Sequence, residues 1–251
     1  MSRIAENLSA IRERIARAAA AAGRSPDSVR LIAVSKLQPA QAIREAYAAG
    51  VRDFGENYVQ ELVKKSDELS DLSDLRFHLI GHLQSNKARA IVGRVSMVHS
   101  VDSVRLAEEL GKRAQTASLD PKKQWPFADG LSGAQTSQTL PVLVEVNVGG
   151  EAQKSGCTPE DTAAVLAAIR GQTSLRAIGL MTVPPFSDEP GQSRPYFDAL
   201  RALRDRVGSE ATLPELSMGM TLDLEQAILA GASMVRVGTA IFGERPRREV
   251  S

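Results

Sequence analysis

Short apolar runs alternate with amphipathic stretches along most of the chain. Each run is a few residues long, rich in branched side chains and bounded by Gly, Pro or polar residues, which is typical of strands buried on both faces. The stretches between the runs carry apolar residues at helical spacing. Strands are predicted at residues 31–34, 51–55, 76–80, 95–99, 141–148, 175–182, 215–217 and 233–237. Helices are predicted at 2–22, 40–49, within 56–69, and at 103–114, 159–170, 193–207 and 223–230, with a last turn through Phe242. A further helix is predicted after Ser85, which is expected to cap it.

Regular alternation of buried strands with helices indicates one α/β domain over residues 1–251, a parallel (β/α)₈ TIM barrel with an extra N-terminal helix. An open doubly wound sheet is the alternative. That fold would more naturally carry a glycine-rich turn after its first strand, where this chain has Ser35-Lys36-Leu37-Gln38. In a barrel, ligands bind at the carboxyl ends of the strands, and Lys36 lies at such an end.

One segment, residues 116–140, interrupts the alternation. It is rich in Ser, Gln, Gly, Pro and Asp and shows neither the helix nor the strand period. We expect an exposed, flexible insertion there. The only tryptophan, Trp125, lies inside this segment, so it is not expected to anchor the core.

Composition excludes several classes of function. The 31 Lys and Arg residues against 30 Asp and Glu residues leave a net charge of +1, which predicts neither a nucleic-acid partner nor binding to an anionic membrane. A single cysteine, Cys157, is typical of a reducing compartment. The charged N-terminus is not a signal peptide, and no apolar run is long enough to span a bilayer. We therefore expect a soluble, cytoplasmic protein.

The lysine at the end of the first strand is a candidate for covalent chemistry. Burial disfavours an ammonium ion, so it lowers the pKa of a lysine and favours the neutral amine that forms imines. A lysine that extends to the protein surface is the ordinary alternative. The loops after the last two strands favour a functional role for Lys36.

The loops after strands 7 and 8, residues 217–221 and 238–239, each combine glycine with a hydroxyl side chain and precede a helix. Barrels often bind phosphate at these two loops. Arg236 lies within the eighth strand, where a charge needs a partner. It either forms a buried ion pair in the barrel floor or donates to a ring nitrogen of a cofactor. Together with an imine-forming lysine, these features describe a site for pyridoxal 5′-phosphate (PLP).

The sequence closely resembles the family of pyridoxal phosphate homeostasis proteins, which are similar in fold to the barrel domain of alanine racemase, the type III PLP-binding fold. The resemblance covers nearly the whole chain, apart from the longer connection at 116–140. It rests on the segments Ala33–Lys36, Phe54–Glu61, His78–Lys87, Lys154–Gly156, Gly179–Thr182, Leu216–Met220 and Val235–Gly243.

The resemblance implies a role for each candidate residue. Lys36 would hold PLP as an internal aldimine, Arg236 would contact the pyridine nitrogen, and Asn57 would lie near the ring face or hydroxyl. Ser217, Met218, Gly219, Gly238 and Thr239 form the phosphate loops. His82 either contacts the cofactor or caps the following helix. His78 and His99 are expected to be hydrogen-bonded strand residues, and Glu56 and Glu61 helix-terminal or surface charges. Lys154 is expected to be a solvated loop lysine, and the alternative is a second amine that handles cofactor in transit.

Two features favour a carrier of PLP over an enzyme. A permanently cationic Arg236 disfavours protonation of the pyridine nitrogen and so weakens the cofactor as an electron sink, although the racemases also use an arginine there. The chain also stops soon after the eighth strand, where those racemases continue into a second domain that completes the site. A monomer that buffers PLP and transiently contacts PLP-dependent apo-enzymes is expected. A small PLP-dependent amino-acid racemase and a Schiff-base aldolase are the alternatives.

Overall fold

The computed structural model describes residues 2–118, 139–187, 189 and 191–243. Eight parallel strands pair in chain order and close into a barrel, with β1 hydrogen-bonded to β8. The predicted (β/α)₈ fold is confirmed. The strands are β1 (Arg30–Val34), β2 (Asp53–Glu56), β3 (Arg76–Leu79), β4 (Met97–Val101), β5 (Leu140–Glu145), β6 (Leu175–Met181), β7 (Glu215–Ser217) and β8 (Met234–Val237).

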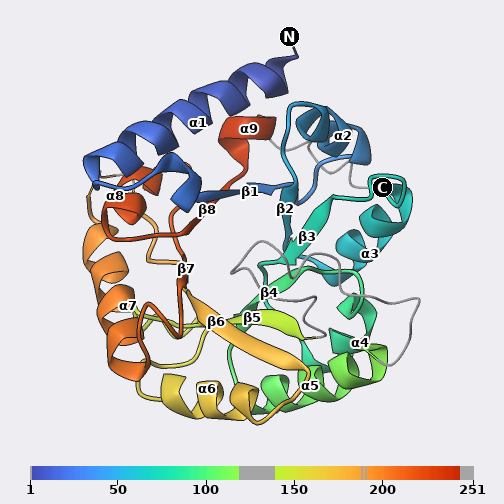
Figure 1. Cartoon of the computed structure of the whole chain (residues 1–251), viewed down its shortest axis with the longest axis vertical. Coiled ribbons are helices and arrows are strands. Elements are labelled where there is room, and N and C mark those ends of the chain that lie inside the picture. The colour runs from blue at the N-terminus through green and yellow to red at the C-terminus, as the bar shows by residue number, and fades with distance from the viewer. Residues whose placement is uncertain (1, 119–138, 188, 190, 244–251) are drawn as a thin grey trace.

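Helices form a ring around the barrel (Figure 1). After β1 to β4 they are α2 (Ala40–Ala48), α3 (Val59–Glu68), α4 (Ala88–Ile91) and α5 (Val104–Ser118). After β5 to β8 they are α6 (Thr162–Arg170), α7 (Arg194–Val207), α8 (Leu224–Leu229) and α9 (Thr239–Phe242). Short 3₁₀ turns occur at η1 (Pro26–Ser28) and η2 (Ser85–Lys87). Within the described part of the chain, none of these helices combines the length and apolar character that crossing a bilayer requires.

The extra N-terminal helix is α1 (Arg3–Ala21), which begins where the Ser2 hydroxyl accepts a hydrogen bond from the Ala5 amide. Its buried stripe follows the helical period, with Leu8, Ile11, Ile15, Ala18 and Ala19 facing the barrel. The helix lies beside α8 and α9, outside β8 and β1 (Figure 1). The Asn7 side chain donates to the Ile241 carbonyl at 2.9 Å. This packing covers the side of the barrel where the short α9 leaves strands exposed.

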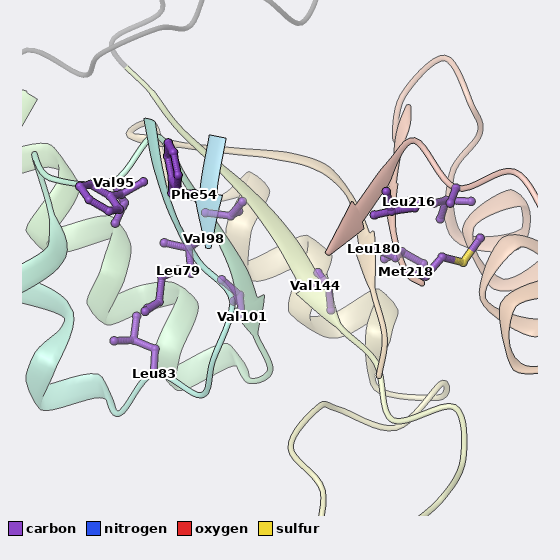
Figure 2. Packing of buried hydrophobic residues seen from close by; sticks show 14 of the residues in the cluster. Phe54, Leu79, Leu83, Val95, Val98, Val101, Val144, Leu180, Leu216 and Met218 are labelled. Atoms are coloured by element: carbon purple, nitrogen blue, oxygen red, sulfur yellow. The ribbon is translucent and has the colours of Figure 1, made fainter. Parts of the chain in front are cut away.

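Buried hydrophobic residues form two groups, one on each side of the barrel wall. The larger group fills the space between strands and helices, and Figure 2 shows part of it, including Phe54, Leu79, Val98, Leu180 and Met218. The smaller group is a separate cluster made entirely of strand residues: Ile32, Met97, Leu143, Ile178, Met181 and Met234. Since neighbouring strand residues point to opposite sides, Ile32 and Ala33 belong to different groups. The smaller group therefore fills part of the barrel interior.

Some predicted boundaries are wrong. Helix α5 continues through Ser118 and β5 begins at Leu140, so the predicted insertion at 116–140 includes residues that belong to regular elements. Residues 119–138, including Trp125, lie outside the described residues. Ser85 does not cap a helix, because η2 begins at Ser85 itself and the preceding Gln84 makes no side-chain cap. The turn there is divided between η2 and the short α4.

Strand β6 carries a bulge that requires glycine. Its pairing with β5 moves from Val142↔Ala177 to Leu143↔Gly179, so β6 contains one extra residue at Ile178. A β-carbon on Gly179 would lie 1.8 Å from the Glu215 carbonyl oxygen of β7. Because a backbone atom cannot move aside as a side chain can, only glycine fits between β5 and β7 at this position.

We expect Gly179→Ala to lower the free energy of unfolding by about 3 kcal/mol or more, because the new methyl group forces β6 and β7 apart. Urea unfolding monitored by circular dichroism measures the loss. Gly171→Ala is the matched control, since its methyl group would meet the Ala168 oxygen at an ordinary 3.4 Å and its φ is −70°. Equal stability of the two variants would contradict the prediction.

Candidate functional site

A pocket of about 380 Å³ opens at the carboxyl ends of the strands. Five of the predicted site residues line it: Lys36, Asn57, Arg236, Gly238 and Thr239. Strand β1, which precedes Lys36, pairs with β8, which precedes Gly238, as predicted from the sequence. A larger hollow of about 650 Å³ lies outside the barrel around Arg89 and Arg94 and contains none of the predicted residues.

The backbone on both sides of Lys36 is held by side chains from β2 and α3. The Leu37 amide donates to Glu61 Oε1 at 2.6 Å, and Leu37 adopts a φ of +62°, which is rare for a branched side chain. The Ser35 carbonyl accepts from Lys65 Nζ at 2.6 Å, and the Ser35 hydroxyl donates to Glu56 Oε1 at 2.6 Å. These contacts fix the turn from which the Lys36 side chain enters the pocket.

Lys65 is the centre of these contacts with Ser35, Glu56 and Glu61, which we call the Lys65 clamp. Its ammonium group is 2.8 Å from Glu56 Oε1 and 2.7 Å from Glu61 Oε1, and its side chain is only 5% exposed. The interpretation of Glu56 as a surface or helix-terminal charge is wrong, because strand β2 extends to Glu56 and buries it completely. Burial raises the pKa of Glu56, and the nearby Lys65 charge opposes that rise. A buried pair of this kind is stable only while both partners are present.

Arg236 is 4% exposed, and its described hydrogen bonds go to neutral acceptors. Its Nη1 donates to Ser217 Oγ at 2.6 Å and its Nη2 to the Thr182 carbonyl at 2.8 Å. Burial lowers the pKa of Arg236 to about 10, while Glu145 and Asp223 act in the opposite direction. The group therefore remains a cation at neutral pH and faces the pocket.

Glu145, at the end of β5, is the buried carboxyl group whose charge acts on Arg236. Burial raises the pKa of Glu145 to about 7; Asp102 adds to the rise and Arg236 opposes it. Its Oε2 atom makes no hydrogen bond within the described part of the chain. The carboxyl group therefore binds its proton more tightly than an exposed glutamate does.

The two predicted phosphate loops each contain a glycine in a confined position. Gly219 has a φ of +90°, and a β-carbon there would lie 2.4 Å from the Ala227 β-carbon on α8. Gly238 packs against β1, since a β-carbon would lie 3.2 Å from the Val34 carbonyl oxygen. In the first loop, the Met220 amide donates to Asp223 Oδ1 at 2.6 Å and closes the turn. Met220, Thr221 and Asp223 line the pocket beside Gly238 and Thr239.

Four predicted residues do not line the pocket. Ser217 is completely buried beneath it, bonded to Arg236 and to His99 Nδ1 at 2.9 Å. Met218 is buried in the outer hydrophobic group (Figure 2). The Gly219 carbonyl accepts from the Arg236 amide at 2.9 Å. His82 is half-exposed, with Nδ1 3.2 Å from Asp102 Oδ2. Contact between the cofactor and any of these four stays a prediction.

Asn57 tests whether the pocket suits a polar aromatic ligand. Its Oδ1 atom is buried and has no hydrogen-bond partner in the described part of the chain. Gly81 allows the backbone of Asn57 to approach closely, because a β-carbon on Gly81 would lie 2.4 Å from the Asn57 carbonyl oxygen. A lysine, a buried guanidinium, a free amide oxygen and two glycine loops fit a ligand with an aldehyde, a ring nitrogen, a hydroxyl group and a phosphate.

Sequence reasoning assigned His78 and His99 correctly as hydrogen-bonded strand residues, which bond each other at 3.0 Å. It missed the Lys65 clamp, since Lys65 appeared to be an ordinary helix residue. It also missed Glu145, although a carboxyl group at the end of a buried strand is a visible signal. Lys154 is less solvated than predicted, because its Nζ donates to the Pro184 carbonyl at 2.7 Å.

The chain is similar to known proteins over nearly its whole length. The family model described as "Alanine racemase, N-terminal domain" matches residues 7–246. A pyridoxal phosphate homeostasis protein from Pseudomonas aeruginosa is 46% identical over 245 residues, covering 98% of this chain and 97% of that protein. The structure of PipY from Synechococcus elongatus with PLP bound is 36% identical, with a TM-score of 0.75, covering 96% of this chain and 100% of PipY.

The fold also extends to distant structures. An alanine racemase from Clostridium difficile aligns with a TM-score of 0.71 at 13% identity, covering 100% of this chain and 59% of the racemase. This likeness shows the common barrel. The chain belongs to the family of the alanine racemase N-terminal domain and, within it, to the pyridoxal phosphate homeostasis proteins.

Proposed function

We propose that this protein binds PLP in the pocket at the barrel mouth and serves PLP homeostasis in the cytoplasm. The observation that carries the proposal is that Lys36 and Arg236 line one pocket together with Gly238 and Thr239. A relative of known structure, PipY, is described with PLP bound, and the relatives of this chain are named as homeostasis proteins.

In this proposal, each residue or loop contacts a different group of the ligand. Lys36 would hold the aldehyde through its amine, as a C=N bond formed with loss of one water molecule. Arg236 would face the ring nitrogen, and Asn57 Oδ1 could accept from the ring hydroxyl. Gly238, Thr239 and the loop of Gly219 would hold the phosphate. The clamp on Ser35 and Leu37 keeps the amine directed into the pocket.

We further propose that the protein holds and releases PLP, as a monomer in transient contact with apo-enzymes, and does not itself catalyse amino-acid chemistry. PLP supplies an electron sink for carbanions when its ring nitrogen is protonated. Arg236 is a cation whose described partners are neutral, so its charge disfavours a second positive charge beside it. The homeostasis names of the relatives agree with this role.

Replacing the proposed imine-forming amine provides the first test. Lys36→Ala should abolish both the visible absorption band of PLP-loaded protein and the covalent adduct found on Lys36 by mass spectrometry after borohydride reduction. Lys64→Ala is the control, because the Lys64 side chain is 76% exposed on α3. An unchanged band in Lys36→Ala would refute the proposed site. Lys36-dependent deuterium exchange at Cα of alanine would instead indicate a racemase.

Removing the centre of the clamp is expected to weaken both fold and site. Lys65→Met leaves Glu56 buried without its counter-charge, which should lower the free energy of unfolding by about 3 kcal/mol in urea titrations. The dissociation constant for PLP should rise as well, because the turn at Lys36 loosens. Lys64→Met, one position earlier on the same helix, is the matched control.

A double variant separates charge from packing in this clamp. Glu56→Gln combined with Lys65→Met removes the unpaired carboxylate and should recover part of the lost stability. The effect of Glu56→Gln on the free energy of unfolding is compared in the native protein and in Lys65→Met. If Glu56→Gln lowers it equally in both, the two groups are not coupled and the clamp is wrong.

The carboxyl group beside Arg236 predicts a pH effect on stability. The pKa of Glu145 is about 7 in the folded protein and 4.5 by reference, so the folded state binds the proton more tightly. Its contribution to stability is complete below pH 4.5 and is lost as pH rises through 7. The free energy of unfolding of Glu145→Gln, relative to that of the native protein, should therefore rise by on the order of 3 kcal/mol between acidic and mildly alkaline pH. Thermal unfolding at a series of pH values measures this, and parallel curves would contradict it.

A further inference from the structure

A chain of hydrogen bonds between buried polar side chains, here called the polar file, runs through the barrel from its base to the pocket. At the base, Arg76 Nε donates to Asp53 Oδ1 at 2.7 Å, and His78 Nε2 lies 2.9 Å from the same oxygen. His78 Nδ1 lies 3.0 Å from His99 Nε2. His99 Nδ1 lies 2.9 Å from Ser217 Oγ, which accepts from Arg236 Nη1 at 2.6 Å.

The file crosses the barrel as well as following it. Asp53, His78 and His99 belong to the adjacent strands β2, β3 and β4, whereas Ser217 and Arg236 belong to β7 and β8. The link from His99 to Ser217 therefore joins two sides of the barrel wall that do not pair with each other (Figure 1). Both histidines are almost completely buried, so water does not replace their partners.

With His78 neutral, hydrogen-bond chemistry gives every link one direction. An ionised carboxylate only accepts, so His78 Nε2 carries the proton shared with Asp53. The second nitrogen of the neutral ring accepts, and His99 Nε2 donates to it. His99 Nδ1 accepts in turn from the Ser217 hydroxyl, which leaves the oxygen of Ser217 free to accept from Arg236. Each link has one donor and one acceptor, with no conflict along the file.

The charges around His99 favour this neutral form. Burial lowers the pKa of His99 well below its ordinary value, and the charges of Arg236 on β8 and Arg30 on β1 act in the same direction. Asp53 on β2 opposes them. For Asp53 itself, burial would raise the pKa, but hydrogen bonds from His78 and Arg76 outweigh it and keep the carboxylate ionised.

We propose that His99 and His78 are positioning residues for the cofactor ring, which fix the Arg236 guanidinium through the oriented hydroxyl of Ser217 and carry changes at the pocket to the base of the barrel. The proposal rests on the proposed PLP site. Neither histidine lines the pocket, so each acts through Ser217 and Arg236 and not by contact with the ligand.

The first test needs no ligand. The chain contains three histidines, so long-range ¹H–¹⁵N spectra of histidine-labelled protein show few signals. His78 and His99 should both appear protonated at Nε2, and His99 should remain a neutral ring across about pH 5 to 8, where an unperturbed histidine changes charge. Protonation of His99 at Nδ1, or titration of His99 within this range, would overturn the assigned direction and with it the proposal.

The second test adds PLP and breaks one link. In the native protein, loading with PLP should shift the ring nitrogens of His99 and His78. Ser217→Ala removes the hydroxyl between Arg236 and His99 and should abolish these shifts. Ser100→Ala is the matched control, because Ser100 is completely buried beside His99 but its hydroxyl has no partner in the described part of the chain.

A conservative pair of variants tests positioning in binding. His99→Leu leaves the Ser217 hydroxyl without its acceptor, so the dissociation constant for PLP should rise about tenfold and the pH profile of the visible band should move. His99→Gln offers an acceptor and a donor and should restore part of both. If PLP attaches to Lys36 but the histidine signals do not respond, the positioning role alone is refuted. If no PLP binds, the proposed function is refuted together with it.

Discussion

The pairing of β1 with β8 is the constraint on which the site depends. Its register places Ala33 opposite Val237, so the chain leaves both strands at the same level. Lys36 emerges from one strand and Gly238 from the other, and both line the same pocket. These residues are about two hundred positions apart in the sequence, and only closure of the barrel brings them together. Any change that opens the barrel therefore separates the amine from the proposed phosphate loops before it alters either one.

Closure also creates the problem of a charge inside the barrel. A guanidinium within a β-strand cannot be solvated, so its hydrogen atoms need acceptors from neighbouring strands. Arg236 obtains them from Ser217 on β7 and from Thr182 after β6, while the interior cluster around Ile32 and Met234 remains apolar. The interior is thus divided into an apolar part and a polar file. The direct acceptors of Arg236 are neutral, and the opposite charges that act on it come from Glu145 and Asp223.

Periodicity was sufficient to predict the barrel, its order and the extra helix, because each depends on local patterns of apolar residues. Barrel topology directs the carboxyl ends of all strands to one mouth, so it also predicted that Lys36, Gly238 and Thr239 meet there, and they line one pocket. It left Arg236 between a buried ion pair and a contact with a cofactor. It could not reveal contacts set by register. The burial of Glu56 depends on β2 continuing to that residue, and the link between His99 and Ser217 joins positions 118 residues apart. The bulge at Ile178 likewise follows from pairing with β5, which no local pattern records.

In the proposed carrier role, the arrangement would hold a ligand without transforming it. The turn at Lys36 is fixed from behind by Glu61 and Lys65, and Arg236 is fixed from beneath by Ser217. Both supports lie outside the pocket, so they can immobilise the groups that grip a ligand without touching its reacting atoms. At the proposed site, the Arg236 guanidinium would offer the ring nitrogen a hydrogen bond but, with a pKa of about 10, no readily transferred proton. Firm binding without a strong electron sink is the combination that the proposed carrier role requires.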